Sequence, residues 1–112
     1  MKGIQKLSEN SAVIHTEIYN GFVFFVVMHS RRGLHPWFCG YVAIPNGHPL
    51  SNVSMDHDSF DEIDCHGGIT FCENIDTNVI IGFDCHHSCD ENNPKDLQFV
   101  ISECKNIIHQ LI

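Results

Sequence analysis

The segment that most constrains the fold is an uninterrupted apolar run at residues 22–28, which reads Phe-Val-Phe-Phe-Val-Val-Met. A continuous run of β-branched and aromatic side chains is typical of a β-strand that is buried on both faces. A second apolar run at residues 37–44 follows a turn whose tip carries Arg31 and Arg32. Two apolar runs separated by a turn predict a long antiparallel hairpin over residues 22–44. We interpret the two arginines as a solvent-exposed hairpin tip rather than a binding site.

Further strands and turns are predicted from weaker signals on both sides of this hairpin. Short apolar or partly alternating runs predict strands at residues 12–18, 60–65, 69–71 and 79–84. Asn20-Gly21 is a strong signal for a hairpin turn. Other turns and loops are expected at residues 66–68, 74–78 and 85–93. Residues 45–60 form a long connection, and long loops of this kind are often functional.

The clearest helix is predicted at residues 97–111. Its apolar residues recur at three- and four-residue spacing, and they are Leu97, Val100, Ile101, Cys104, Ile107, Ile108 and Leu111. Such a stripe packs against a core, so we interpret Cys104 as a small buried apolar residue. Asp96 is suited to cap the helix N-terminus. Together the elements predict an α+β fold in a single domain, residues 1–112, with a mainly antiparallel twisted sheet and the C-terminal helix packed on one face.

The net charge of the chain indicates which classes of macromolecule are suitable partners. Its 112 residues carry a formal net charge of −8, from 14 acidic and 6 basic residues. Non-specific binding to nucleic acid needs clustered Lys and Arg, so we expect no direct nucleic-acid partner. An acidic surface suits a basic protein partner, or it serves solubility alone.

The sequence predicts a cytoplasmic setting. Its N-terminus shows no apolar segment of the signal-peptide type, and no run approaches the roughly 18–20 apolar residues that a membrane span requires. We therefore expect no membrane partner. In the cytoplasm, the 6 cysteines are expected to be thiols or metal ligands and not a disulfide framework.

Metal-competent side chains concentrate at residues 62–90, and the 9 histidines of the chain strengthen the expectation of a metal site. If the strands at 60–65 and 79–84 lie at comparable heights in one sheet, polar residues at their ends converge. The candidate ligands in this arrangement are His48, His66, Asp84, His87 and Asp90. Mixed histidine and carboxylate ligation is typical of zinc sites that keep a position open for water.

An alternative ligand set consists of cysteine thiolates. The candidates are Cys65, Cys72, Cys85 and Cys89. The last two have a C-x3-C spacing, which zinc sites allow, whereas the C-x6-C spacing of the first two is looser. Interpretations without a metal also stay open, because His87 can be a solvent-exposed loop histidine and Asp84 can cap the turn after its strand.

An acidic segment at residues 56–64 is interpreted as protein surface. It lacks the loop spacing and the glycine of an EF-hand calcium site. As surface, it is a candidate partner-binding face, carried by Asp56, Asp58, Asp61 and Glu62.

Three motifs follow one another within residues 37–111. They are Gly40-Tyr41-Val42 with Ile44-Pro45 and Gly47-His48-Pro49-Leu50, then His66-Gly67-Gly68-Ile69-Thr70, then Gly82-Phe83-Asp84 with His87 and Asp90. In these motifs the chain resembles a family of small phage and prophage proteins, and some small acidic phage proteins resemble anti-CRISPR inhibitors. The resemblance implies a phage origin, action inside a host cell, and the five histidine and aspartate residues above as the polar positions. The four candidate cysteine ligands lie outside the family pattern, which leaves the choice of ligand set open.

The leading hypothesis is a zinc-binding, non-enzymatic protein of phage type that inhibits a host defence protein. A Cas nuclease is such a partner, because its basic nucleic-acid channel complements a net charge of −8. In this hypothesis Zn²⁺ holds the long loop at residues 45–60 and the loop at residues 85–93 against the sheet. The acidic segment at residues 56–64 supplies part of the face that binds the partner.

Two alternatives belong to other functional classes. The first is a metal-dependent hydrolase, in which the histidine and carboxylate set holds the metal and Asp90 or a nearby carboxylate acts as general base on a bound water. The second is a nucleotide-sequestering protein, with the Gly67-Gly68 turn approaching a phosphate.

We expect protein purified without a histidine tag to contain about one zinc ion per chain. The variants His66→Ala and His87→Ala should each lose the zinc and become less thermally stable, because a bound metal stabilises the fold that holds it. Elemental analysis and thermal unfolding of the three proteins measure this. A wild-type protein without metal would contradict a shared site within residues 62–90.

Overall fold

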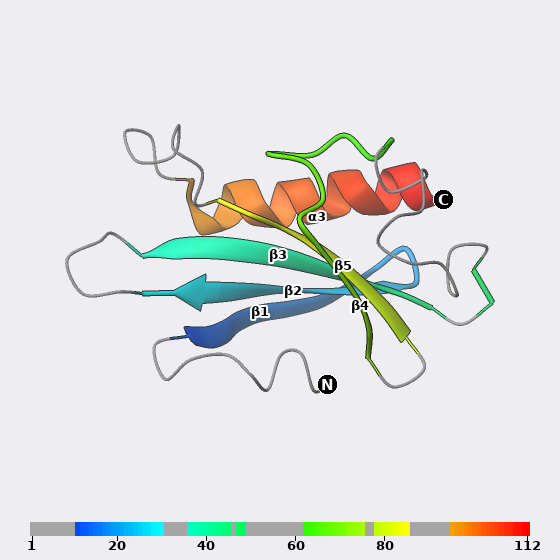
Figure 1. Ribbon diagram of the computed structural model, residues 1–112, viewed down its shortest axis with the longest axis horizontal. Coiled ribbons are helices and arrows are strands. Elements are labelled where there is room, and N and C mark those ends of the chain that lie inside the picture. The colour runs from blue at the N-terminus through cyan, green and yellow to red at the C-terminus, as the bar shows by residue number, and fades with distance from the viewer. Residues whose placement is uncertain (1–10, 31–35, 46, 49–61, 76–77, 86–94) are drawn as a thin grey trace.

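The structure, a computed structural model, describes residues 11–30, 36–45, 47–48, 62–75, 78–85 and 95–112 (Figure 1). These residues form a five-stranded antiparallel sheet with a C-terminal helix packed on one face, so the predicted α+β fold is confirmed. The elements are β1 (Ser11–Tyr19), β2 (Phe22–His29), β3 (Trp37–Ile44), β4 (Phe71–Ile75), β5 (Asn78–Asp84) and α3 (Leu97–Leu111). The strands are arranged in the order β1-β2-β3-β5-β4.

The first three strands form two successive hairpins where the sequence predicts them. Asn20 and Gly21 have φ angles of 51° and 82°, the left-handed conformations that a two-residue type I′ turn requires. Tyr19 and Phe22 pair across this turn. β2 then pairs with β3 along most of its length, which confirms the hairpin predicted over residues 22–44.

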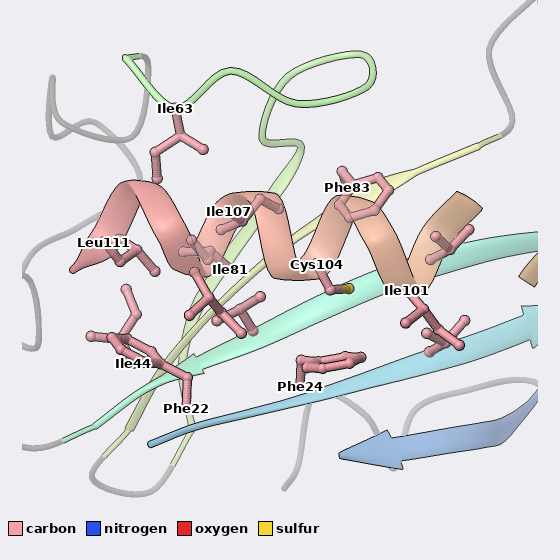
Figure 2. Packing of buried hydrophobic residues seen from close by; sticks show 14 of the residues in the cluster. Phe22, Phe24, Ile44, Ile63, Ile81, Phe83, Ile101, Cys104, Ile107 and Leu111 are labelled. Atoms are coloured by element: carbon pink, nitrogen blue, oxygen red, sulfur yellow. The ribbon is translucent and has the colours of Figure 1, made fainter. Parts of the chain in front are cut away.

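The strand predicted at residues 60–65 is wrong in the part that is described, because residues 62–65 form no strand. Side chains of α3 satisfy the backbone there instead. The N–H of Asp64 donates to Gln110 Oε1 at 2.8 Å, and its carbonyl accepts from Gln110 Nε2 at 2.8 Å and Asn106 Nδ2 at 2.9 Å. Peptide groups that already have partners need no neighbouring strand. Ile63 beside them is buried against the helix (Figure 2).

The edge strand β4 begins two residues later in the chain than the strand predicted at residues 69–71. It also runs into the segment predicted as a turn at residues 74–78. Phe71 lies opposite Gly82 and Ile75 lies opposite Asn78. Pairing with the apolar strand β5 therefore extends β4 through polar residues that the local pattern assigned to a turn.

The helix α3 has the bounds that its apolar stripe predicts. The N–H of Phe99 donates to Asp96 Oδ1 at 2.8 Å, which confirms the predicted N-cap. In the part of the chain that is described, no helix has the length and apolar character needed to cross a membrane.

Alternating side chains give the sheet two different faces. On the helix face, the core contains Phe22, Phe24, Val26, Val42, Ile44, Val79, Ile81 and Phe83 from the sheet, Val100, Ile101, Cys104, Ile107, Ile108 and Leu111 from α3, and also Ile63 and Cys85. Figure 2 shows part of this core. On the opposite face, here called the helix-free face, a smaller cluster contains Phe25, Val27 and Ile80, with Tyr41, Ala43 and Phe71 packed against it. β2 contributes to both clusters, so the prediction of a strand buried on both faces is confirmed.

Two glycines allow large side chains to lie across the central strands β3 and β5. On the helix face, a Cβ added at Gly40 would lie 2.6 Å from the Phe83 ring and 2.7 Å from Cys104 Sγ. On the helix-free face, a Cβ added at Gly82 would lie 2.5 Å from the Tyr41 ring. Gly40 pairs with Phe83, and Tyr41 pairs with Gly82. Each strand therefore supplies a glycine beneath an aromatic ring of its neighbour, once on each face.

The variant Gly40→Ala is expected to lower the free energy of unfolding by roughly 1–3 kcal/mol, because the added methyl group overpacks the space between Phe83 and Cys104. Urea denaturation measures this. Adding Phe83→Leu should recover part of the loss, since the smaller side chain leaves the methyl group room, and the double variant then shows a coupling energy. Strictly additive effects of the two substitutions would contradict this account.

Candidate functional site

His48 lies at the C-terminal end of α3. Its Nε2 donates a hydrogen bond to the carbonyl of Leu111 at 2.7 Å, and its ring meets the Phe22 ring edge-on with centroids 5.8 Å apart. Donation to a carbonyl requires a proton on Nε2, and a nitrogen that carries this proton is not a metal ligand. An open depression of about 780 Å³ beside it is lined by Asn20, Phe22, His48, Leu111 and Ile112. The imidazole of His48 thus connects the turn after β3 to the C-terminal end of α3 through a hydrogen bond.

His66 lies near the other end of α3. Its ring meets the Phe99 ring edge-on, with centroids 5.3 Å apart. The turn that holds it is closed by the N–H of Gly68, which donates to the carbonyl of Cys65 at 2.9 Å. Between Phe99 and Leu111 the helix rises by roughly 18 Å. The structure therefore does not bring His66 together with His48.

Asp84 ends β5 on the helix-free face, where it lies opposite Cys39 of β3. His66 lies on the helix side of the sheet, against Phe99. The convergence expected for these two residues depended on a strand at residues 60–65, and residues 62–65 follow α3 instead. Asp84 and His66 are thus separated by the sheet.

The predicted metal site is only partly covered by the structure. Across the ranges that are described, no group of three or more His, Cys, Asp or Glu side chains is arranged to hold a metal ion. Several predicted residues lie outside those ranges, namely His87, Asp90 and Cys89 among the ligands and Asp56, Asp58 and Asp61 in the acidic segment. Glu62 is described and exposed. Zinc binding remains a prediction from the sequence.

Three of the cysteines lie near one another on the helix face. Cys104 is fully buried, and Cys65 and Cys85 are close enough that a negative charge on either raises its pKa further. Burial raises the pKa of Cys65 and of Cys104 from 9.0 to about 12, and the carboxylate of Glu103 adds to both shifts. Burial also raises the pKa of Cys72. Thiols with such pKa values are protonated at neutral pH, and a protonated thiol is a poor nucleophile.

A polar group on the helix-free face was not anticipated from the sequence. Cys39 and Tyr41 lie two residues apart on β3, close enough that each affects the pKa of the other, and Asp84 lies opposite Cys39. Burial, with a smaller contribution from the Asp84 charge, raises the pKa of Cys39 from 9.0 to about 12. Burial is also the main cause of the raised pKa of Tyr41. Alternation along residues 37–44 places the thiol and the phenol on one face, but the pairing with Asp84 cannot be read from local sequence.

An aromatic row crosses the same face. The rings of Phe25 and Tyr41 are stacked, with centroids 5.2 Å apart and an interplanar angle of 19°. The rings of Tyr41 and Phe71 meet edge-on, with centroids 5.2 Å apart and an angle of 85°. Gly82 lies on the strand between the last two residues and leaves the space for this contact. The row thus joins β2, β3 and β4 across β5.

The border of the helix-free face is apolar on the side of β1 and β2. Ile18 and Val13 of β1 lie opposite Val23 and Val27 of β2. Ile18 is 73% exposed, Val13 is 46% exposed and Val23 is 39% exposed. Apolar side chains with this exposure, next to a partly buried aromatic row, form the kind of surface that proteins use for association.

The described lysines lie on one side of the sheet only, whereas carboxylates lie on both sides, with Glu17 and Glu103 on the helix side. The helix-free face carries the carboxylates of Asp84 and of Glu73, which lies opposite Ile80 of that face. The two lysines in the described ranges lie on the helix side: Lys95 Nζ is 5.5 Å from the centroid of the Phe99 ring, and Lys105 Nζ is 3.4 Å from Glu17 Oε2. Within the described ranges, the helix-free face therefore combines apolar and acidic groups without a lysine.

Comparison with protein-family models, with curated proteins and with solved structures found no match to this chain. The resemblance to small phage proteins therefore stays a prediction from the three motifs.

The buried thiols are expected to make the protein lose stability at alkaline pH. The pKa of Cys104 is raised in the folded state, so unfolding releases its proton once the pH exceeds 9.0, and stability falls from there until the pH passes about 12. Each such thiol contributes a slope of about 1.4 kcal/mol per pH unit at most. Urea denaturation across this range should show a shallower slope for Cys104→Ala than for the wild type. Equal slopes of unfolding free energy against pH in the two proteins would contradict the assignment of this stability loss to the buried Cys104 thiol.

Proposed function

We propose that this protein acts by association with a basic protein surface, through the helix-free face of its sheet, and not by catalysis. One observation carries the proposal: this face combines an aromatic row, exposed aliphatic residues at its border and carboxylates. Interfaces are typically built from such an aromatic and aliphatic centre with a polar rim. The net charge of −8 favours a basic partner over an acidic one.

The chemistry of the described cysteines supports association over nucleophilic catalysis. An activated cysteine nucleophile needs a lowered pKa, whereas the pKa values of Cys39, Cys65 and Cys104 are raised to about 12. The separation of His48, His66 and Asp84 also weakens the hydrolase alternative, which needs those three ligands around one metal.

The proposed partner is a host defence protein of the Cas nuclease type, in the host cytoplasm. Such a nuclease holds nucleic acid in a positively charged channel, and an acidic apolar face is complementary to the walls of that channel. Zinc binding belongs to the same proposal. Asp84 is one of the candidate ligands and lies opposite Cys39 on the helix-free face, so a zinc ion bound to Asp84 would lie beside the proposed binding face.

Purified, guide-loaded Cas nucleases test this proposal directly. We expect the wild-type protein to bind at least one of a panel of such complexes and to inhibit its DNA cleavage. The double variant Val23→Lys/Glu73→Lys should weaken inhibition by roughly 10-fold or more, because it places positive charge on the binding face. The matched control Gln98→Lys/Glu103→Lys makes the same change in net charge on α3 and should retain inhibition.

Two results would contradict the proposal. The absence of both binding and inhibition across the panel would exclude this class of partner among the nucleases tested. An equal loss of inhibition in the two double variants would show that net charge matters and that the helix-free face does not.

A further inference from the structure

The strand β1 presents a long edge of the sheet. It spans Ser11–Tyr19, and within the described ranges it pairs only with β2. Edge strands of natural proteins are commonly protected from pairing by lysine, by proline, by β-bulges or by short length. β1 has 9 residues and contains neither lysine nor proline, and its register shift lies toward its first residues, between Val13 and His15. The other edge strand, β4, has only 5 residues.

The exposed apolar side chains of the described residues concentrate on this edge. Ile14 is 39% exposed, Val13 is 46% exposed and Ile18 is 73% exposed. A register shift lies between Val13 and His15, and the remainder of β1 pairs regularly with β2 from His15 to Tyr19. The outer side of that regular part, together with Ile14 directly before it, therefore offers an extended backbone flanked by β-branched side chains, which suits the addition of another strand.

The residues of this edge are self-complementary. The segment reads Ile14-His15-Thr16-Glu17-Ile18, which has an isoleucine at each end, a histidine and a glutamate in equivalent positions, and a threonine at the centre. If two copies pair antiparallel about Thr16, each isoleucine lies opposite an isoleucine and each His15 lies opposite the Glu17 of the other copy. Aliphatic, threonine and opposite-charge pairs are the cross-strand pairs that stabilise sheets.

The histidine and the glutamate already interact within one chain. His15 Nε2 lies 2.9 Å from Glu17 Oε1, and Lys105 Nζ lies 3.4 Å from Glu17 Oε2. The hydrogen bond from His15 lowers the pKa of Glu17, which keeps the carboxylate ionised at neutral pH. A second copy in this register brings another imidazole to each carboxylate as a hydrogen-bond donor, so the pairing places no like charges directly opposite each other.

We infer that a second copy of this chain pairs with the β1 edge, antiparallel across a two-fold axis at Thr16, and joins the two five-stranded sheets into one continuous sheet. Any strand could pair with the backbone groups and the aliphatic side chains of this edge. A second copy presents the same residues in the reverse order, so its isoleucines, His15 and Glu17 meet complementary residues all along the edge. A two-fold interface requires such self-complementarity. The inference does not depend on the proposed host partner, and it places the two helix-free faces side by side in one assembly.

Sedimentation velocity of the tag-free wild-type protein is expected to show a dimer that dissociates on dilution. The variant Ile18→Lys should be monomeric, because it places a lysine on the edge of both copies. The matched control Ile112→Lys changes a residue of similar exposure, 75% against 73% for Ile18, and should remain dimeric. Circular dichroism and thermal unfolding establish that both variants are folded.

A charge exchange tests the register. The variant His15→Glu alone should be monomeric, because it places acidic residues opposite each other across the axis. The double variant His15→Lys/Glu17→Lys alone should also be monomeric, because it places lysines opposite each other. An equimolar mixture of the two should recover the dimer, since each lysine then meets a glutamate. The inference would be overturned by a monomeric wild type, or by a mixture of folded charge variants that stays monomeric. It would equally be overturned if the dimer survived Ile18→Lys or were lost in Ile112→Lys.

Discussion

The reciprocal packing of glycines and aromatic rings on β3 and β5 is the constraint on which the two layers depend. Phe83 lies over Gly40 on the helix face, and Tyr41 lies over Gly82 on the helix-free face. Without a side chain at Gly40, Cys104 of α3 also approaches the sheet closely. The glycines would weaken isolated strands, because they add backbone entropy and no packing surface. Here each one is covered by a ring from the neighbouring strand, so both faces remain filled.

This arrangement divides the sheet into two faces with different roles. The helix face is closed by α3 and contains the larger core (Figure 1). The helix-free face has a buried centre, an aromatic row and an exposed aliphatic border at β1 and β2. The two lysines of the described ranges lie on the helix side, whereas carboxylates lie on both sides, with Asp84 and Glu73 on the helix-free face and Glu17 and Glu103 on the helix side. The fold thus separates a stabilising surface from one whose composition suits association.

Polar side chains connect the segments outside the strands to α3, and one of them is the candidate metal ligand His48. The imidazole of His48 binds the last turn of α3 through the Leu111 carbonyl. The side chain of Gln110 satisfies the backbone of Asp64 through two hydrogen bonds. These contacts attach the connections between strands to the helix without a neighbouring strand. Histidine and amide side chains perform this task well because they donate to carbonyl groups at the open end of a helix or in a loop.

The local elements of this protein were determined by the sequence alone. The Asn20-Gly21 turn, the strand over residues 22–28 and the helix over residues 97–111 depend on φ preferences and on the spacing of apolar residues within a few positions. The N-cap at Asp96 is equally local. Strand pairing between β1, β2 and β3 then follows from short connections between strongly apolar runs, and the α+β class follows from the order of the elements.

The tertiary structure alone decided which distant residues meet. Asp84 lies with Cys39, His66 lies with Phe99, and Asp64 lies with Gln110. These pairings depend on the register between β3 and β5 and on the path of residues 62–70 along α3. Both are set by contacts between segments far apart in the chain, which periodicity and turn signals do not encode. The candidate ligands could therefore be named from the sequence, but their separation into different places required the assembled fold.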